Sequence, residues 1–405
     1  MITKKQIYCV IAILFVSSMF SFTNAQSNMQ TSAQPNMQTN VQPNMQTSTQ
    51  SNVMPAQIAL EAQSAIVMDK ESNRVLYEKD IHSQRSMASL TKIMTCIVAL
   101  ENGNLNDIVI VSEQAANIGG SGIKLKENDE VKLEELLYGL MLKSGNDAAI
   151  AIAEHIGGSY DQFVQMMNDK ATALELVNTS FANPHGLDHD DHFSSAYDLA
   201  RLSAYALQNP KFAQIVSTKE IHFPKFYFSN TNELLFSYPN ATGIKTGYTG
   251  NAGRCLVTSA QYGETTLISV VLQCNTRNQR AASSKKILNY ASAEFERRVL
   301  MEENAFIGDV AVIKGRTAFV HAKTKEQVVY PLSDAEMERL EKHMVFLQER
   351  RAPVQQGEIV GEIGFYLDSE RIGGTEIYLT DTIMKKNVMD FFVEIWRSWF
   401  AFLLG

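Results

Sequence analysis

Apolar and polar positions alternate in two short stretches near residue 65 and predict a β-hairpin. Residues 64–69, "SAIVMD", and 74–79, "RVLYEK", are separated by the polar residues 70–73, which suit a turn. A mostly helical block follows, in which leucines recur with the spacing i, i+3, i+4 and i+7 and so form one apolar helix face. These are Leu133, Leu136, Leu137 and Leu140. Helical spacing continues through 147–156, 160–176 and 196–207.

Strand-like patterns return near residue 254. The runs "RCLVTSA" at 254–260 and "TLISVVLQC" at 266–274 are joined by the short turn Tyr262-Gly263-Glu264. A helix is then expected from about residue 281 to 297. Since strands lie at both ends of the block and helices lie between them, we expect one sheet with helices packed against it. Residues 58–298 are therefore predicted to form an α/β domain.

Short alternating runs with Gly and Pro between them follow residue 299 and predict a small, separate β domain over 299–384. The runs are "DVAVIKG", "TAFVHA", "VVYPL", "GEIVGEIGFYL" and "GTEIYLT".

The last segment, 385–405, predicts an amphipathic helix. Its polar residues recur at i, i+4, i+7 and i+8 and form one stripe, while aromatic and aliphatic residues cover the remainder. The segment is short and charged for a membrane-spanning helix, and its pattern suits a helix lying in the membrane interface. A helix docked on its own domain or on a sister subunit is the alternative. The stripe consists of Asp390, Glu394, Arg397 and Ser398.

The first 57 residues predict export followed by a tether. Lys4 and Lys5 precede an apolar run from 7 to 22, and the small residues that follow suit cleavage of a signal peptide, 1–25. A retained membrane anchor is the alternative, although the run is short for one. Residues 26–57 repeat with a period of eight, beginning "QSNMQTSA" and "QPNMQTNV". They contain no charged or aromatic residue, so we expect a disordered linker.

Charge and cysteine content narrow the function classes. The 405-residue chain has a formal net charge of −8 and no basic stripe, which argues against binding of nucleic acid. Cys9 would leave with the signal peptide. The spacing of Cys96, Cys255 and Cys274 matches neither a zinc nor a redox pattern, so buried free thiols are expected. A disulfide between Cys255 and Cys274 is the alternative.

Three short motifs carry the candidate chemistry. Ser89 and Lys92, in "ASLTKIM", share one face of a predicted helix start. Ser144-Gly145-Asn146 follows the leucine-rich helix and so lies in a connection between helices. Lys245-Thr246-Gly247 precedes a predicted strand and is expected on the edge strand that faces the helices. Ser89 as a simple helix cap is the alternative for the first motif, but three motifs in this order favour an active site.

The chain resembles the serine-type D-Ala-D-Ala carboxypeptidases, which are low-molecular-weight penicillin-binding proteins with S-x-x-K, S-x-N and K-T-G in this order. Further similar segments are "NTSFANPHGLD", "SSAYDLARL", "NTNELL" and "GIKTGYTGNAG". The resemblance implies a penicillin-binding/β-lactamase-like fold, no cofactor or metal, a peptidoglycan stem peptide as substrate and β-lactams as covalent inhibitors. It also implies that Arg280 binds the substrate carboxylate and that the backbone N–H groups of Ser89 and Tyr248 form the oxyanion hole.

The residues themselves suit this chemistry. A serine hydroxyl needs a base to become a nucleophile, and Lys92 can accept the proton of Ser89 only as a neutral amine. Ser144 could pass a proton to the leaving D-alanine, and Asn146 could hold the substrate amide. Lys245 and Thr246 offer a charge and a donor to the terminal carboxylate. Gly247 would let the substrate backbone approach closely.

A metal site in the 184–192 loop and two rival functions are the other interpretations of the sequence. The loop 184–192, "PHGLDHDDH", is rich in His and Asp, but it lacks the spacing of a zinc site, and Asp198 nearby is expected to be a structural partner. A β-lactamase would add a glutamate in an E-x-x-L-N loop, whereas the similar string at 175–178 has different spacing. A non-catalytic peptidoglycan-binding protein would not need Ser89, Lys92 and Ser144 together.

Overall fold

The computed structural model describes residues 58–404. The predicted signal peptide, 1–25, and the predicted linker, 26–57, lie outside the described residues and stay predictions. The described part contains an α/β domain, which ends with helix α10 (Arg277–Glu294), and a β domain, which begins with strand β10 (Glu296–Met301).

A five-stranded antiparallel sheet forms the centre of the α/β domain. In spatial order its strands are β2 (Val75–Lys79), β1 (Ser64–Asp69), β9 (Thr265–Cys274), β8 (Gly253–Tyr262) and β7 (Ala241–Thr249). Strands β1 and β2 pair as the first predicted hairpin, and β8 and β9 pair as the second, so both predictions are confirmed. The strand with the Lys245-Thr246-Gly247 motif, β7, forms one edge of the sheet, as predicted.

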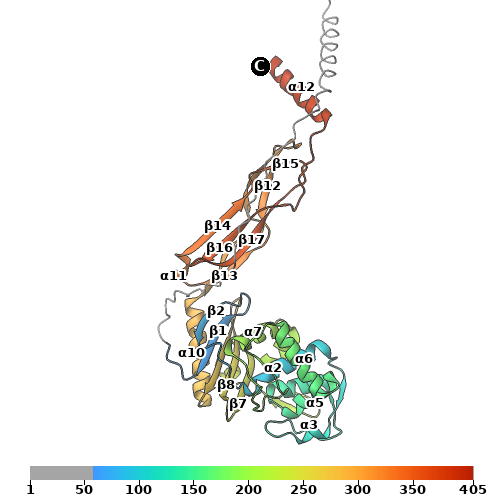
Figure 1. The fold of residues 1–405 in the computed structure, drawn as a ribbon, viewed down its shortest axis with the longest axis vertical. Helices are drawn as coiled ribbons and strands as arrows, with labels where there is room; N and C mark the ends of the chain where they lie inside the picture. Colours follow the sequence, from blue (N-terminus) through green and yellow to red (C-terminus); the bar gives the residue numbers. More distant parts are fainter. Residues whose placement is uncertain (1–57, 405) are drawn as a thin grey trace, which may run out of the picture. The chain divides into compact units, whose positions relative to one another are not determined.

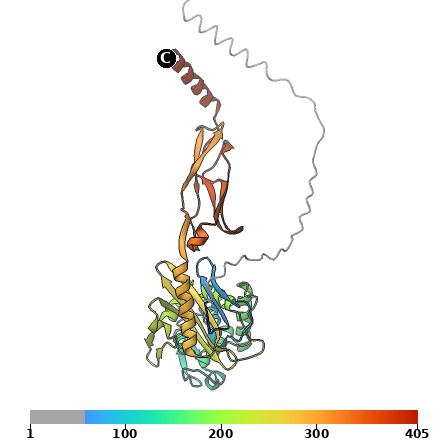
Figure 2. The same ribbon diagram turned by 90° about the vertical axis from the view of Figure 1, so that its left-hand side faces the viewer.

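Successive side chains of this sheet alternate between two cores. On β8, Cys255 and Val257 face the core shared with most of the helices, whereas Leu256 faces the core shared with α10. Figures 1 and 2 show α10 on one face of the sheet and, on the opposite face, helices such as α2 (Lys92–Asn102), α5 (Asn146–Gly157), α6 (Tyr160–Ala173) and α7 (Ala196–Ala206). The inner strands β1, β8 and β9 are therefore buried on both sides along most of their length, which explains why their sequences are largely apolar.

Helix α2 (Lys92–Asn102) is deeply buried, because every residue from Lys92 to Ala99 is buried. The predicted leucine face lies on α4 (Leu133–Leu142), where all its leucines are buried. The other helices of the domain are α3 (Glu113–Asn117), α5 (Asn146–Gly157), α6 (Tyr160–Ala173), α7 (Ala196–Ala206), α8 (Pro210–Ser217) and the short α9 (Leu234–Ser237). Two small hairpins are β3 (Ile108–Ile110) with β4 (Glu130–Lys132) and β5 (Glu220–His222) with β6 (Tyr227–Ser229).

Helix α10 differs from the expected range of 281–297. It begins earlier because Thr276 and Gln279 form a capping box, in which each side chain accepts a hydrogen bond from the backbone N–H of the other. It ends at Glu294 because the residues from Glu296 onward pair as β10 with β13 (Val328–Leu332). A local cap and the start of a strand thus move the helix toward the N-terminus.

The cysteines Cys96, Cys255 and Cys274 are buried and free, as expected, and no disulfide joins the last two. Cys255 belongs to the core on the helical face of the sheet, whereas Cys274 belongs to the core on the α10 face. Burial raises the pKa of both thiols, that of Cys255 to about 12 and that of Cys274 to about 11. Both therefore act as small apolar side chains.

The predicted β domain is confirmed. Its six-stranded sheet has the order β14-β16-β17-β12-β11-β15, and Val310, Ile363 and Leu379 are part of its separate core. Strand β10 spans the predicted boundary at residues 298 and 299. The sheet consists of β11 (Phe306–Ile313), β12 (Phe319–Thr324), β14 (Leu340–Phe346), β15 (Glu349–Arg351), β16 (Ile359–Leu367) and β17 (Glu370–Leu379), and the short helix α11 (Asp334–Met337) precedes β14.

Strand β14 has no counterpart among the predicted runs. It pairs with β16 at one edge of the sheet, and most of its residues are exposed. Edge strands commonly carry charged residues, and Glu341, Lys342 and His343 hide the alternation that marks a half-buried strand.

The helix expected over 385–405 is present as α12 (Val388–Leu404). Asn387 caps it: the Asn387 side chain accepts from the Asp390 backbone N–H at 2.9 Å, and the Asp390 carboxylate accepts from the Asn387 backbone N–H at 2.8 Å. Among residues 58–404, no helix is both long and apolar enough to cross a bilayer.

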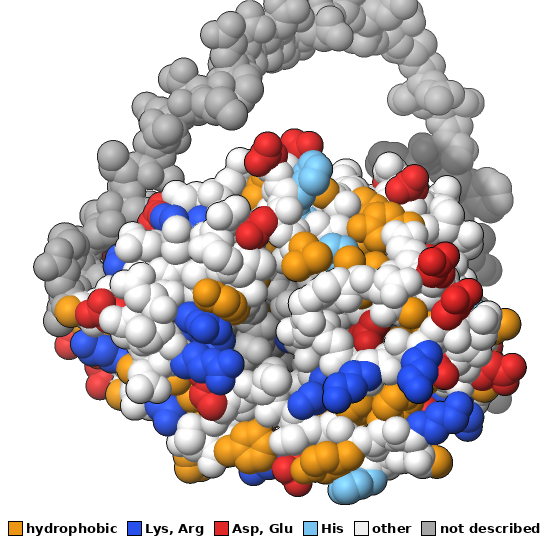
Figure 3. Space-filling view, turned by 90° about the horizontal axis from the view of Figure 1, so that it is seen from below, with side chains coloured by type: hydrophobic (Ala, Val, Ile, Leu, Met, Phe, Trp, Pro, Cys, Tyr) orange, Lys and Arg blue, Asp and Glu red, His pale blue; other side chains and the backbone are white. Residues whose placement is uncertain are grey.

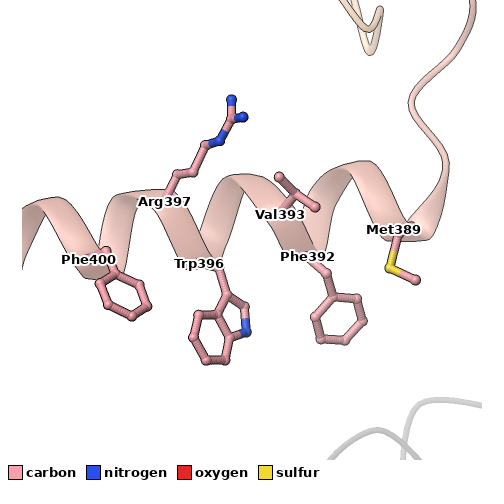
Figure 4. Close-up of a pocket in the computed structure, with 6 residues that line it drawn as sticks. All are labelled: Met389, Phe392, Val393, Trp396, Arg397 and Phe400. Carbon is pink, nitrogen blue, oxygen red and sulfur yellow. The ribbon is translucent and has the colours of Figure 1, made fainter.

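One side of α12 is strongly apolar. Figure 4 shows the large side chains on one side of the helix and Arg397 on the other. The apolar side chains are exposed, with Trp396 at 63% and Phe400 at 53%. The apolar side drawn in Figure 4 consists of Met389, Phe392, Trp396 and Phe400.

Candidate active site

The Ser89-x-x-Lys92 motif lies where a short 3-10 helix, η1 (Ala88–Thr91), leads into α2. Lys92 is the first residue of α2, and its Nζ lies 3.1 Å from Ser89 Oγ. The N-cap residues of the two helices are Met87 and Thr91, and neither helix has a side-chain cap. The alternative in which Ser89 only caps a helix does not fit this geometry.

Lys92 is completely buried, which is rare for a lysine. Its Nζ also contacts Asn146 Oδ1 at 2.8 Å and the carbonyl oxygen of His185. Burial, followed by the charge of Lys245, holds the pKa of Lys92 well below its ordinary value, while the Asp147 carboxylate opposes the shift. The shift favours the neutral amine, which is the form that can accept a proton.

The second motif lies between α4 and α5, as predicted. Ser144 is nearly buried and has a left-handed backbone with φ of 61°. The Asn146 amide has two partners within the protein, because Oδ1 faces Lys92 and Nδ2 donates to the Gly119 carbonyl at 2.8 Å. The expected contact of this amide with the substrate stays a prediction, and in the structure its oxygen accepts from Lys92.

Asp147, which follows this motif, was not singled out in the sequence. Its carboxylate accepts from the backbone N–H groups of Ile123 and Leu125 and from that of Ala148. These bonds tie the 120–125 segment to the start of α5. An acidic residue in the first turn of a helix was the available signal, but it is too common to point to an active site.

The third motif brings strand β7 against the turn formed by Met87, Ala88 and Ser89, which we call the serine turn. Lys245 is buried, and its Nζ donates to the Thr246 carbonyl at 3.0 Å. A Cβ at Gly247 would lie 3.0 Å from the Met87 carbonyl oxygen and 3.3 Å from the Ser89 nitrogen. A side chain at Gly247 would therefore crowd the turn that carries Ser89, and the expected close approach of the substrate backbone at Gly247 stays a prediction.

Lys245 and Arg280 form the basic side of the site. Burial, followed by the charge of Arg280, lowers the pKa of Lys245 to about 7. Arg280 is only 3% exposed, and its Nη2 lies 2.6 and 2.7 Å from the two carboxylate oxygens of Glu233. Glu233 lies in the matched segment "NTNELL", but nothing in the sequence pattern indicated that it would occupy the arginine expected to bind substrate.

Thr246 and Tyr248, also on β7, are more exposed than Lys245. Thr246 Oγ1 lies 3.1 Å from Thr231 Oγ1, so these hydroxyls share a hydrogen bond. The Tyr248 side chain is 54% exposed, and the Arg254 guanidinium lies over its ring at 3.5 Å from the centroid. The sequence motifs did not point to Arg254, which lies opposite Tyr248 in the pairing of β7 with β8.

The histidine-rich loop 184–192 supports the serine turn. His185 and His192 are buried and His189 is exposed. Gly186 has φ of +91°, and a Cβ there would overlap the Ala88 carbonyl group. Among the described residues, no three His, Cys, Asp or Glu side chains are grouped so that they could hold a metal ion.

Asp198 behaves as the expected structural partner. Its Oδ2 accepts from the Asn178 N–H and from the Thr179 hydroxyl, both at 2.8 Å. Glu175, the acidic residue of the β-lactamase-like string, lies at the end of α6 with an exposed side chain paired to Arg201. It therefore has no contact with the Ser89–Lys92 pair.

Basic and acidic side chains are both spread over the face of the molecule in Figure 3, with apolar side chains between them. This mixture agrees with the formal net charge of −8. The basic side chains on that face do not form one continuous stripe of the kind that binds nucleic acid.

Two family models match the chain. The model described as D-alanyl-D-alanine carboxypeptidase, of the peptidase S11 family, matches residues 47–276. The model described as the C-terminal domain of penicillin-binding protein 5 matches residues 295–385. The first match contains the three motifs, although not Arg280, and the second contains the β domain.

Curated relatives agree with this assignment along most of their length. D-alanyl-D-alanine carboxypeptidase DacF of Bacillus subtilis is 35% identical over 358 residues, which cover 86% of this chain and 92% of that protein. D-alanyl-D-alanine carboxypeptidase DacA of Escherichia coli is 32% identical over 366 residues, which cover 86% and 91%.

Solved structures agree as well. Penicillin-binding protein 5 of Haemophilus influenzae matches with a TM-score of 0.70 and 30% identity, and the match covers 82% of this chain and all (100%) of that chain. A Streptomyces K15 DD-transpeptidase variant matches with a TM-score of 0.56 and 33% identity, covering 58% and 99%. The chain therefore belongs to the D-alanyl-D-alanine carboxypeptidase family and has that family's carboxypeptidase function.

Proposed function

We propose that the chain removes the terminal D-alanine from peptidoglycan pentapeptides through an acyl-enzyme on Ser89, and that β-lactams acylate the same hydroxyl. The observation that carries this proposal is the completely buried Lys92 amine at 3.1 Å from Ser89 Oγ. A buried amine with a lowered pKa and a hydroxyl partner is suited to general base catalysis.

The reaction takes two steps. In the first, Ser89 Oγ attacks the carbonyl carbon of the penultimate D-alanine, and its proton passes to Lys92 Nζ. The C–N bond then breaks, and the leaving D-alanine nitrogen takes a proton, for which Ser144 is the proposed relay. In the second, water attacks the ester, its proton passes to the same base, and the Ser89 hydroxyl is restored.

Two backbone N–H groups are proposed to stabilise the oxyanion, those of Ser89 and Tyr248. Support comes from the close approach of β7 to the serine turn at Gly247. Donors fixed in a backbone need no rearrangement when charge develops on the carbonyl oxygen, which makes them effective in a tetrahedral intermediate.

The terminal carboxylate is proposed to bind near Lys245, Thr246 and Arg280. Lys245 supplies an ammonium group when protonated, and Thr246 supplies a hydroxyl donor. Arg280 shares its charge with Glu233, so its contribution is weaker than that of a free guanidinium. No metal or cofactor takes part in the proposed steps.

We also propose that the enzyme works outside the cytoplasm, held at the outer face of the membrane by α12. The support is the exposed apolar side of α12 opposite a polar stripe, a pattern suited to an interfacial helix. A mature chain that begins after residue 25 and a linker over 26–57 remain part of this proposal.

The first prediction concerns the acylated residue. Labelled penicillin should modify Ser89, and Lys92→Met, which keeps the volume of the side chain, should slow acylation by about 100-fold or more because the base is lost. Intact-mass and fragment-ion mapping measures both. Ser86 would share a tryptic peptide with Ser89, so Ser86→Ala is the matched control and should label normally. Label on Ser86, or normal acylation of Lys92→Met, would contradict the mechanism.

The second prediction concerns Gly186. Gly186→Ala should lower the free energy of unfolding by about 1–3 kcal/mol, since the new Cβ overlaps the Ala88 backbone, and should slow acylation about 100-fold by displacing Ser89. Gly158→Ala is the control, because Gly158 also has positive φ but has open space around it. Chemical denaturation and penicillin acylation measure the two effects. Equal acylation by both variants would contradict the role of the loop.

The third prediction concerns pH. Lys245 has a pKa of about 7, so its ammonium form is lost as the pH rises through 7. For a substrate with a terminal carboxylate, KM should rise with pH by up to about tenfold per unit above this value. A peptide with an amidated terminus should show no such rise, although it binds more weakly. Steady-state kinetics between about pH 6 and 9 measure KM for both peptides. If KM changed with pH in the same way for both, Lys245 would not be the group that binds the terminal carboxylate.

The fourth prediction concerns α12. A chain ended after Lys386 keeps the β-domain residue Ile383 and should lose membrane association while keeping carboxypeptidase activity. Membrane flotation and release of D-alanine measure the two properties. Trp396→Glu should weaken association because it places a charge on the apolar side, and Glu394→Gln on the polar stripe is the control. A truncated chain that is inactive or aggregated would mean that α12 is part of the folded core instead.

A further inference from the structure

A buried histidine lies behind the serine turn. His192 comes from the loop that precedes α7 and is 2% exposed. Its Nδ1 lies 3.0 Å from the Ala182 nitrogen, and its Nε2 lies 2.7 Å from Thr91 Oγ1. Both ring nitrogens are thus engaged by the protein, which leaves neither free for a metal ion.

The partners determine the tautomer of the ring. The Ala182 backbone N–H can only donate, so Nδ1 accepts and the ring proton lies on Nε2. Thr91 Oγ1 in turn donates to the Ala88 carbonyl oxygen at 2.8 Å. A directed chain of hydrogen bonds therefore runs from Ala182 through His192 and Thr91 to Ala88.

The ring is held in its neutral form. Burial, followed by the charges of His189 and Lys92, lowers the pKa of His192 to about 4. Near neutral pH the ring therefore keeps one donor and one acceptor, which is what the two contacts require. Phe181 packs against the ring edge with a centroid separation of 5.9 Å and fixes its plane.

Ala88, which accepts the last of these hydrogen bonds, has an unusual backbone conformation. Its φ is +49°, a left-handed value that is uncommon for residues other than glycine. Such a conformation persists only where the surroundings enforce it. Gly186 and Gly247 pack against this turn from two sides, and the Thr91 hydroxyl binds its carbonyl oxygen. The next residue is Ser89, so the direction of Ala88 determines where the Ser89 hydroxyl points.

We propose that His192 is a positioning residue for acyl transfer: through Thr91 it holds the left-handed Ala88 turn and thereby directs the Ser89 hydroxyl toward Lys92. The inference rests on the proposed role of Ser89 as the nucleophile. It also gives a role to His192 in the histidine-rich loop, for which the sequence predicted no metal site.

Substitutions at both ends of the hydrogen bond test the proposal. His192→Leu removes the donor and the acceptor, whereas His192→Gln retains one of each. Stopped-flow acylation by a penicillin should show a rate constant about 10- to 100-fold lower for the Leu variant, with an initial dissociation constant within about threefold of the parent. The Gln variant should recover most of the rate, which a merely space-filling role would not predict.

Thr91 supplies the second pair of variants. Thr91→Val should slow acylation as His192→Leu does, and Thr91→Ser, which keeps the hydroxyl, should not. The double variant His192→Leu/Thr91→Val should be no slower than the slower single variant, because both changes break one chain of bonds. Circular dichroism and thermal unfolding establish which variants are folded. If His192→Leu does not fold, the Val and Ser variants at Thr91 decide the question.

The outcomes separate this inference from the mechanism on which it rests. Normal acylation by His192→Leu or Thr91→Val, equal rates for the Leu and Gln variants, or independent effects in the double variant would overturn the positioning role while Ser89 labelling stayed intact. A parent protein that is not labelled on Ser89 would overturn the proposed nucleophile itself, and the positioning role with it.

Discussion

The burial of one lysine amine is the constraint on which the site depends. An ammonium ion without access to water is costly, so a buried lysine tends to be neutral or paired. The Lys92 amine has Ser89 and Asn146 as side-chain partners, and Lys245 adds a second positive charge nearby. A helix that begins with such a residue must be enclosed, and α2 is accordingly buried from Lys92 to Ala99. The buried Thr95 hydroxyl of α2 donates to the Pro184 carbonyl in the neighbouring loop.

Two glycine-containing segments that enclose the start of α2 also pack unusually close to the backbone of the serine turn. Gly186 from the histidine-rich loop and Gly247 from β7 both approach Ala88, and a side chain at either position would meet the backbone of the turn. The strained conformation of Ala88 is therefore held by contacts from segments far apart in the sequence. In the proposed mechanism, the same contacts that enclose this turn also direct the Ser89 hydroxyl.

The basic side of the site carries less positive charge than its residues suggest. Lys245 has a pKa of about 7, and Arg280 is paired with Glu233. An anionic substrate terminus would favour protonation of Lys245 on binding, so part of the binding energy would be spent on this change.

Local patterns in the sequence were enough to predict both hairpins of the main sheet and the leucine face of α4, because each depends on residues close together in the chain. The edge position of β7 was also predicted, although it depends on how distant strands pair. They did not reveal strand β14, whose charged edge hides its period, or the early start of α10, which a capping box determines. The pairing of Glu233 with Arg280 and the bond between His192 and Thr91 depended on the tertiary structure alone. These partners are distant in sequence, and only the tertiary packing of loops and helices on the sheet brings them within hydrogen-bonding distance.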